Sequence, residues 1–129
     1  MAKFTNATVL DAALQEIIDN CDLMVACTGL PATFLEATTT MKLADIARAP
    51  GDFTGPGDGT APGSREITVE AVADVTIDTT GTAINVALLD STAGTAGAVL
   101  HVAECTSLML IGAQKVNFPD WKIIFLQPT

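Results

Sequence analysis

The chain has 129 residues, of which 49% are apolar and 16% are charged, and its formal net charge is −9 at pH 7. This length favours a single domain, residues 1–129, whose core needs no metal and no disulfide. The six lysines and arginines are scattered along the chain, which argues against direct binding of nucleic acid or of an anionic membrane surface.

The first predicted element is a helix over residues 8–20. Apolar residues recur there at the helical period, from Val9 to Ile18, and polar residues occupy the opposite face. Asn6 or Thr8 can cap its first turn. The start of the chain lacks the continuous apolar run of a signal peptide. No later run approaches the roughly 18 apolar residues of a membrane span, so we expect neither segment.

Two short strands and a helical turn are expected next. The strands lie at residues 22–29 and 42–49, the second because polar and apolar residues alternate along it. Between them, Thr33 and Glu36 have the spacing of a capping box, which predicts a helical turn near residues 34–38.

Glycine and proline then crowd residues 50–64, and we predict a long loop there without regular structure. The remaining residues, 65–129, follow a rhythm of short strands and turns. The first of these strands places Ile67, Val69 and Ala71 toward the core.

A hairpin is predicted over residues 74–90, with its turn at Thr80 and Gly81. Its second arm places Ile84, Val86 and Leu88 on one face. Further along the chain we expect a second turn and then four more strands, at residues 99–105, 108–112, 114–119 and 121–128.

The last strand is apolar on both faces. Trp121, Ile123 and Phe125 lie on one face, and Ile124 and Leu126 on the other. Such a strand is expected to be either central in the fold or covered by another subunit.

These elements predict a mainly β fold of the α+β class. We expect an antiparallel β-sandwich or small barrel of about seven or eight strands, with the N-terminal α-helix packed on it.

No residue pattern indicates catalysis, and we expect a protein that is not an enzyme. The single histidine, His101, is expected to share a strand face with Val99 and Ala103. Cys105 lies on the same face but about 13 Å further along the strand, which is too far for a nucleophile–base pair.

Paired carboxylates give no stronger indication of an active site. Glu66 and Glu70 point outward from one strand, as carboxylates of glycosidases do across a cleft. Such enzymes also stack sugars on aromatic rings, whereas this chain has no tyrosine and a single tryptophan.

Metal and cofactor motifs are also missing from the sequence. It has no CxxC or HExxH pattern, the loop lacks the spacing of a calcium hand, and no lysine completes a phosphate-binding loop. We therefore expect no metal and no cofactor. The three cysteines, Cys21, Cys27 and Cys105, suit small buried apolar side chains in a reducing compartment, with an intermolecular disulfide as the alternative.

Two segments supply candidate subunit contacts. In the loop, Phe53 is an apolar side chain on a glycine-rich tether, which either folds back into its own core or docks on a neighbour. The candidate contacts are Asp52, Phe53, Thr54 and Asp58 in the loop and Trp121, Ile124 and Leu126 in the last strand.

The order of segments resembles a group of small structural proteins from the virions of tailed bacteriophages. The similar segments are TNATVLDAALQEIIDNCD, TTTMKLAD, GDFTGP, GSREITVEAVADVTIDTTGTAINVALLDS and VNFPDWKI, which cover nearly the whole chain. These are strand and turn patterns and carry no catalytic residues over to this sequence.

This resemblance implies a repeated subunit of a phage particle, made in the host cytoplasm and located in the virion. Its partners would be copies of itself and other virion proteins of the capsid, neck or tail. Decoration of the capsid is the first reading, and a component of the neck, collar or tail is the second. A soluble ligand- or glycan-binding β module is the alternative of another class.

Overall fold

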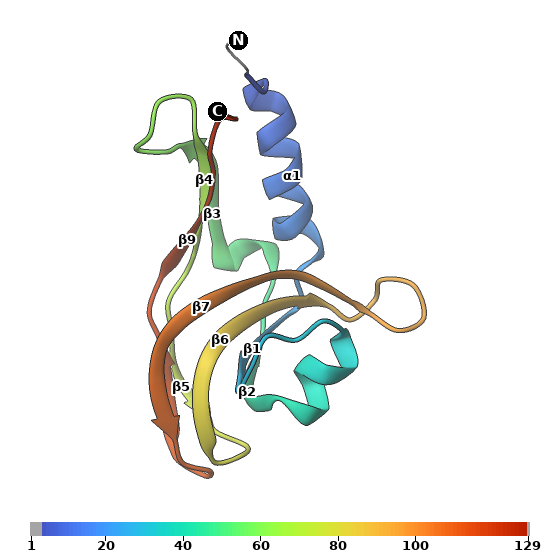
Figure 1. Cartoon of the computed structure of the whole chain (residues 1–129), viewed down its shortest axis with the longest axis vertical. Helices are drawn as coiled ribbons and strands as arrows, with labels where there is room; N and C mark the ends of the chain where they lie inside the picture. The colour runs from blue at the N-terminus through green and yellow to red at the C-terminus, as the bar shows by residue number, and fades with distance from the viewer. Residues whose placement is uncertain (1–3, 129) are drawn as a thin grey trace.

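The computed structural model describes residues 4–128, which form one elongated body in which the start of α1 and the segment after β9 lie at the same end (Figure 1). The expected class is confirmed, since the fold is mainly β with an N-terminal helix packed against antiparallel sheets. In this part of the chain there are nine strands in three sheets, and the sheets do not close into a barrel.

The helices and short helical turns are α1 (Ala7–Asn20), the π-helical η1 (Glu36–Thr40) and the 3₁₀-helical η2 (Pro50–Asp52). The strands are β1 (Leu23–Cys27), β2 (Lys42–Ala47), β3 (Phe53–Asp58), β4 (Arg65–Val69), β5 (Val72–Thr76), β6 (Gly81–Asp90), β7 (Ala98–Leu110), β8 (Lys115–Phe118) and β9 (Trp121–Phe125). The predicted first helix is therefore confirmed. Its cap is Asn6, whose side chain accepts a hydrogen bond from the Thr8 N–H.

The predicted helical turn after β1 is also present. The Thr33 hydroxyl accepts a hydrogen bond from the backbone N–H of Glu36 at 3.1 Å, which is one half of a capping box. The Glu36 carboxylate accepts from the Ala32 N–H at 3.0 Å. The helical conformation continues to Thr40.

Every ladder in the three sheets is antiparallel. The largest sheet has the strand order β2-β1-β6-β7, the second has the order β3-β4-β9, and β5 pairs with β8 in the third. Figure 1 shows the four-stranded sheet curving through the lower half of the molecule, while β3, β4 and β9 run beside α1 in the upper half.

The four-stranded sheet is buried on both faces at its centre. On the inner face, Met24 and Leu88 belong to the main core, which extends up to α1. On the outer face, Val25 and Leu89 belong to a second, smaller core. The segment that carries η1 covers this outer core, because Phe34, Ala37 and Met41 pack there.

The helix α1 packs over the inner face of the β3-β4-β9 sheet. Its apolar stripe buries Leu14, Ile17 and Ile18 in the main core. An ion pair fixes the rotation of the helix, because Arg65 of β4 donates to both carboxylate oxygens of Asp11, at 2.7 and 3.0 Å.

The buried cation Arg48 ties the two halves of the molecule together. It is 7% exposed, and its Nη2 donates to the carbonyl oxygens of Glu70 at 2.6 Å and Asp52 at 3.4 Å. Its backbone N–H donates to the Asp22 carbonyl. These bonds connect the end of β2 to the start of β3 and to the end of β4.

The prediction of a structureless loop over residues 50–64 is wrong. Residues 50–64 contain η2 and β3, and within this segment only the stretch after Asp58 is a turn. Glycine and proline are tolerated here because β3 is an edge strand, which in the described part of the chain pairs only with β4, and its register shifts between Thr54 and Gly57. A proline in an edge strand costs no ladder hydrogen bond when its missing N–H faces outward.

The predicted hairpin over residues 74–90 is also wrong. β5 pairs with β8, and β6 pairs with β1 and β7. The alternation of polar and apolar residues around Thr80 and Gly81 resembles that of a hairpin. In the structure β6 instead lies between β1, which precedes it in the chain, and β7, which follows it. The hairpin that does form joins β6 to β7 through the second predicted turn.

Irregularities in the strands move several side chains from their predicted faces. Ile84 is exposed, because the β6–β7 register shifts beside it and Ala83 enters the core instead. A second shift separates the faces of Val99 and His101, which were expected together. Ala71 is exposed, because β4 ends at Val69.

Replacing Arg48 with methionine should lower the free energy of unfolding by roughly 1–3 kcal/mol, because the partly buried carbonyl oxygens of Glu70 and Asp52 lose a charged donor. Urea denaturation followed by circular dichroism measures the change. The matched control is Lys115→Met at the exposed first residue of β8, which should stay within about 0.5 kcal/mol of the wild-type chain. An equally small change in the unfolding free energy of the Arg48 variant would contradict a stabilising role for these hydrogen bonds.

Candidate functional site: an open seam between β7 and β8

Six strands of the lower half form an incomplete ring with one open seam. The four-stranded sheet continues from β2 to β5 through the bridge between Ala44 and Ile77 and two backbone bonds to the Leu43 carbonyl. The strands at the two ends of this series are β7 and β8. Within the described residues β7 pairs only with β6, and β8 only with β5, so no ladder joins β7 to β8.

The seam is closed at one end by the short turn between β7 and β8. The Gln114 N–H donates to the Ile111 carbonyl at 3.1 Å, and Ile77 exchanges backbone hydrogen bonds with Ala113 and Gln114. These bonds hold the base of β8 against the end of β5. The two strands therefore diverge from the turn instead of forming a hairpin ladder.

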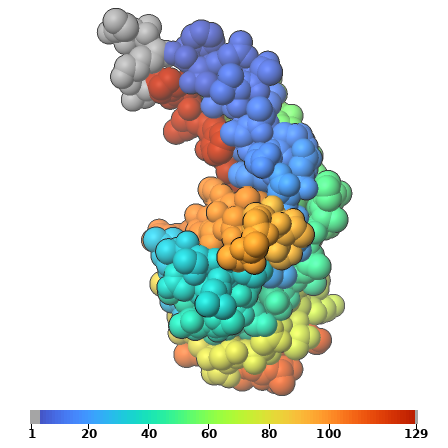
Figure 2. All heavy atoms as spheres, turned by 90° about the vertical axis from the view of Figure 1, so that its right-hand side faces the viewer, coloured from blue at the N-terminus to red at the C-terminus, as the bar shows by residue number. Residues whose placement is uncertain are grey.

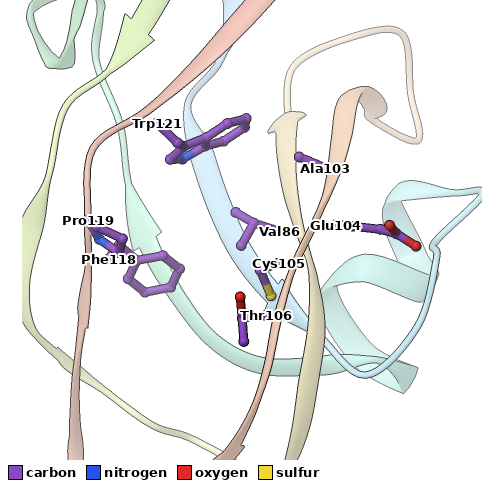
Figure 3. A pocket seen from close by; sticks show the side chains of 8 residues that line it. All are labelled: Val86, Ala103, Glu104, Cys105, Thr106, Phe118, Pro119 and Trp121. Carbon is purple, nitrogen blue, oxygen red and sulfur yellow. The ribbon is translucent and has the colours of Figure 1, made fainter.

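Two adjoining cavities fill the seam, with volumes of about 310 and 230 Å³. Their shared lining comes from β6 (Val86), β7 (Cys105 and Thr106) and the β8 segment (Phe118 and Pro119). Figure 3 shows Phe118 and Pro119 on one side of the opening and Cys105 and Thr106 on the other, while Glu104 points away from it. The site is an apolar groove between two strands.

Trp121 forms the end of the groove opposite the turn. Its ring stacks on His101 of β7 with a centroid separation of 6.0 Å and an interplanar angle of 27°. The indole Nε1 is buried and has no acceptor in the described part of the chain. Figure 3 places this nitrogen on the edge of the ring that faces Val86.

The groove has little reactive chemistry of its own. Burial raises the pKa of the Cys105 thiol above its ordinary value, so the thiol stays protonated at neutral pH and is a poor nucleophile. Burial also lowers the pKa of His101, which stays neutral in the same pH range. Cys21 and Cys27 are buried elsewhere, and burial raises the pKa of each to about 11.

Two further findings concern residues 4–128. No group of three or more histidine, cysteine and acidic side chains there could hold a metal ion. None of the helices in this range has the length and apolar character to cross a membrane.

The structure brings together two of the candidate contact residues. Phe53 of β3 lies opposite Val69 of β4, and Val69 lies opposite Trp121 of β9. The three side chains form one row across the sheet and face the main core. Phe53 is 8% exposed, so of its two predicted placements the structure has the one in its own core. Trp121 is half-buried and also lines the groove.

The other loop candidates are engaged within the chain. Asp52 accepts a hydrogen bond from the Ala49 N–H at 2.8 Å, Thr54 donates to the Glu70 carboxylate, and Asp58 pairs with Arg65. They remain at the surface, but their polar groups already have partners.

The last strand is not central, because among residues 4–128 β9 pairs only with β4 and is an edge strand. Its predicted alternation is present. Ile123 is buried, while Ile124 and Leu126 are 44% and 65% exposed. These two side chains form an apolar outer face of the strand.

Sequence reasoning did not find the groove. Cys105, Thr106 and Phe118 carry no motif, and their convergence depends on which strands pair. The strands predicted at residues 108–112 and 114–119 gave no indication of the space between them.

Comparison with known proteins finds no matching family model, no matching curated protein and no matching solved structure.

Lowering the pH from 7.5 to 5.5 should reduce the free energy of unfolding through His101. Burial lowers the pKa of His101 in the folded chain, so the unfolded chain binds this proton first as the pH falls below about 6.5. The stability that the neutral imidazole of His101 contributes is complete above that pH. It is lost as the pH falls toward the pKa that His101 has in the folded chain. Urea denaturation at several pH values measures the slope.

The control for this prediction is His101→Gln, which removes the only histidine of the chain. Its unfolding free energy should be nearly independent of pH in the same interval, because carboxylates titrate lower. The same slope in both proteins would assign the pH dependence to another group.

Proposed function

We propose that the chain is a non-enzymatic structural protein of a tailed-bacteriophage virion, which decorates or cements the capsid through protein–protein contacts. The similarity of its segment order to small virion proteins supports this proposal. The observation that carries it is a set of apolar side chains left at the surface in three separate places.

The first apolar surface lies at the end of β7, where Met109 and Ile111 are 60% and 57% exposed. The second surrounds η1, where Leu30 and Leu35 are 70% and 68% exposed. The third is the outer face of β9. Single exposed apolar side chains are ordinary, whereas groups of them mark contact sites.

The second surface also contains a crevice of about 390 Å³. Residues 32–35 and 96–99 line it, and Figure 2 shows the η1 region (cyan) and the β6–β7 turn (orange) side by side on this face. A subunit in a particle contacts several neighbours at once, and three apolar surfaces on different elements suit that role. Many copies of a weak contact can then give stable attachment through symmetry and avidity.

The same surfaces would serve a component of the neck, collar or tail. A soluble ligand-binding β module is the second candidate, and the apolar groove beside Trp121 favours it. A single pocket would account for that function, but it would leave the three exposed surfaces without a role.

The proposal predicts that the protein accompanies phage particles in many copies. Antibody raised against the purified chain should detect it in the particle fraction of a density gradient, with several copies for each copy of the portal protein. Immunogold labelling of the particles then separates a capsid position from a tail position. Detection only in the soluble fraction of the lysate would refute the virion assignment.

A second prediction concerns the surface at the end of β7. The double variant Met109→Glu, Ile111→Glu should bind particles that lack the protein at least about tenfold more weakly, since apolar contact is replaced by desolvated charge. Its thermal unfolding should be nearly unchanged, because both side chains are exposed. The control Ala12→Glu, Thr60→Glu adds the same charge at exposed positions outside the three apolar surfaces. Equal loss in both variants would assign the effect to net charge alone.

A further inference from the structure

The outer edge of β7 is long and poorly protected. It spans 13 residues, Ala98–Leu110, and carries one charged side chain, Glu104, with neither proline nor lysine. Proteins usually protect such edges with charge, proline or a covering segment, because free N–H and C=O groups pair with other chains. The register shifts against β6 bend this strand but add no charge to it.

A second free edge faces β7 across the groove. β8, Lys115–Phe118, pairs only with β5 among the described residues, and Val116, Asn117 and Phe118 line the cavity opposite Cys105 and Thr106. Below these edges lie small apolar side chains, Ala26, Ala83 and Val86. The groove therefore has the walls of two strands and an apolar floor.

Among the described residues the facing edges of β7 and β8 have no strand partner, so their outward backbone N–H and C=O groups lie unpaired beside this apolar floor. A row of carbonyl and amide groups beside alternating apolar side chains is the chemistry of an extended polypeptide. A lipid or small apolar ligand would leave both strand edges unpaired.

We propose that the seam between β7 and β8 accepts an extended strand of about five residues from another protein, which completes the ring of strands. Alternate apolar side chains of this strand fill the groove, and its backbone bonds to the free edges of β7 and β8. Lysine or arginine lies at its intervening positions.

Charge identifies the donor as a partner with basic residues rather than a second copy. The chain carries a net charge of −9, and Glu104 lies on β7 beside the opening. Two copies would repel each other, whereas a strand with cationic residues is attracted. Lys115 at the start of β8 is already bonded to the Thr76 hydroxyl.

The inference does not depend on the virion assignment, since the groove would accept a strand in any setting. Its test therefore uses the purified chain alone and succeeds or fails separately from the particle experiments.

The probe is a blocked nonapeptide with valine at alternate positions and lysine between them, KVKVTVKVK. Trp121 is the only tryptophan of the chain and lines the groove, so its fluorescence reports occupancy directly. We expect a saturable change in emission with the basic peptide. The serine peptide KSKSTSKSK, the acidic peptide EVEVTVEVE and a backbone N-methylated form of the first should each bind at least about tenfold more weakly.

A matched pair of variants locates the site. Thr106→Phe fills the groove and should weaken binding about tenfold, whereas Ser107→Phe, exposed and outside both cavities, should stay within about twofold. Unchanged circular dichroism melts establish that both variants fold. No saturable response to the basic peptide, or equal affinity of its N-methylated form, would overturn the proposal. So would a dimer in sedimentation that Thr106→Phe dissociates, because a second copy would then occupy the seam.

Discussion

The whole structure depends on the burial of β1 and β6 on both faces of their sheet. Leu88 faces the main core and Leu89 the outer core, and each fully buried leucine contributes about 1.5–3 kcal/mol. A one-residue slip of β6 would exchange the side chains of the two cores and disrupt the close packing of both, which disfavours other registers of β1 and β6. Burial of the outer face also requires another segment of the chain to cover it, and the η1 segment does so.

The open seam follows from the same constraint. β6 fixes β7 on one side of the ring, while the bonds of Ile77 to Ala113 and Gln114 hold β8 against β5. The turn between β7 and β8 is short, yet the two strands are committed to different sheets. Phe118 and Trp121 line the opening between them. The groove is thus a consequence of strand pairing elsewhere in the fold.

The sequence predicted what local periodicity determines. The helix α1, the alternation of β9 and the helical turn after Thr33 each follow from side chains within a few residues of one another. Which strands pair with one another could not be predicted in this way. β5 and β8 are separated by nearly forty residues, and no local pattern specifies their pairing. Strand β3 was missed because glycine and proline indicate a loop unless the strand lies at an edge. The groove was missed for the same reason as the partners, since Cys105 and Phe118 converge only after the sheets are assigned.

The acidic surface and the unprotected edge of β7 are compatible because net charge acts between whole molecules, whereas the edge acts only at short range. A long edge with a single charge would invite pairing between copies, and local protection by lysine would also block a donor strand. Net charge repels copies over about a Debye length without altering the edge itself. A chain of net charge −9 can therefore remain dispersed while the groove stays open to a strand of opposite charge. Selectivity then lies in long-range repulsion between like chains, and affinity in the short-range match of backbone and apolar side chains at the seam.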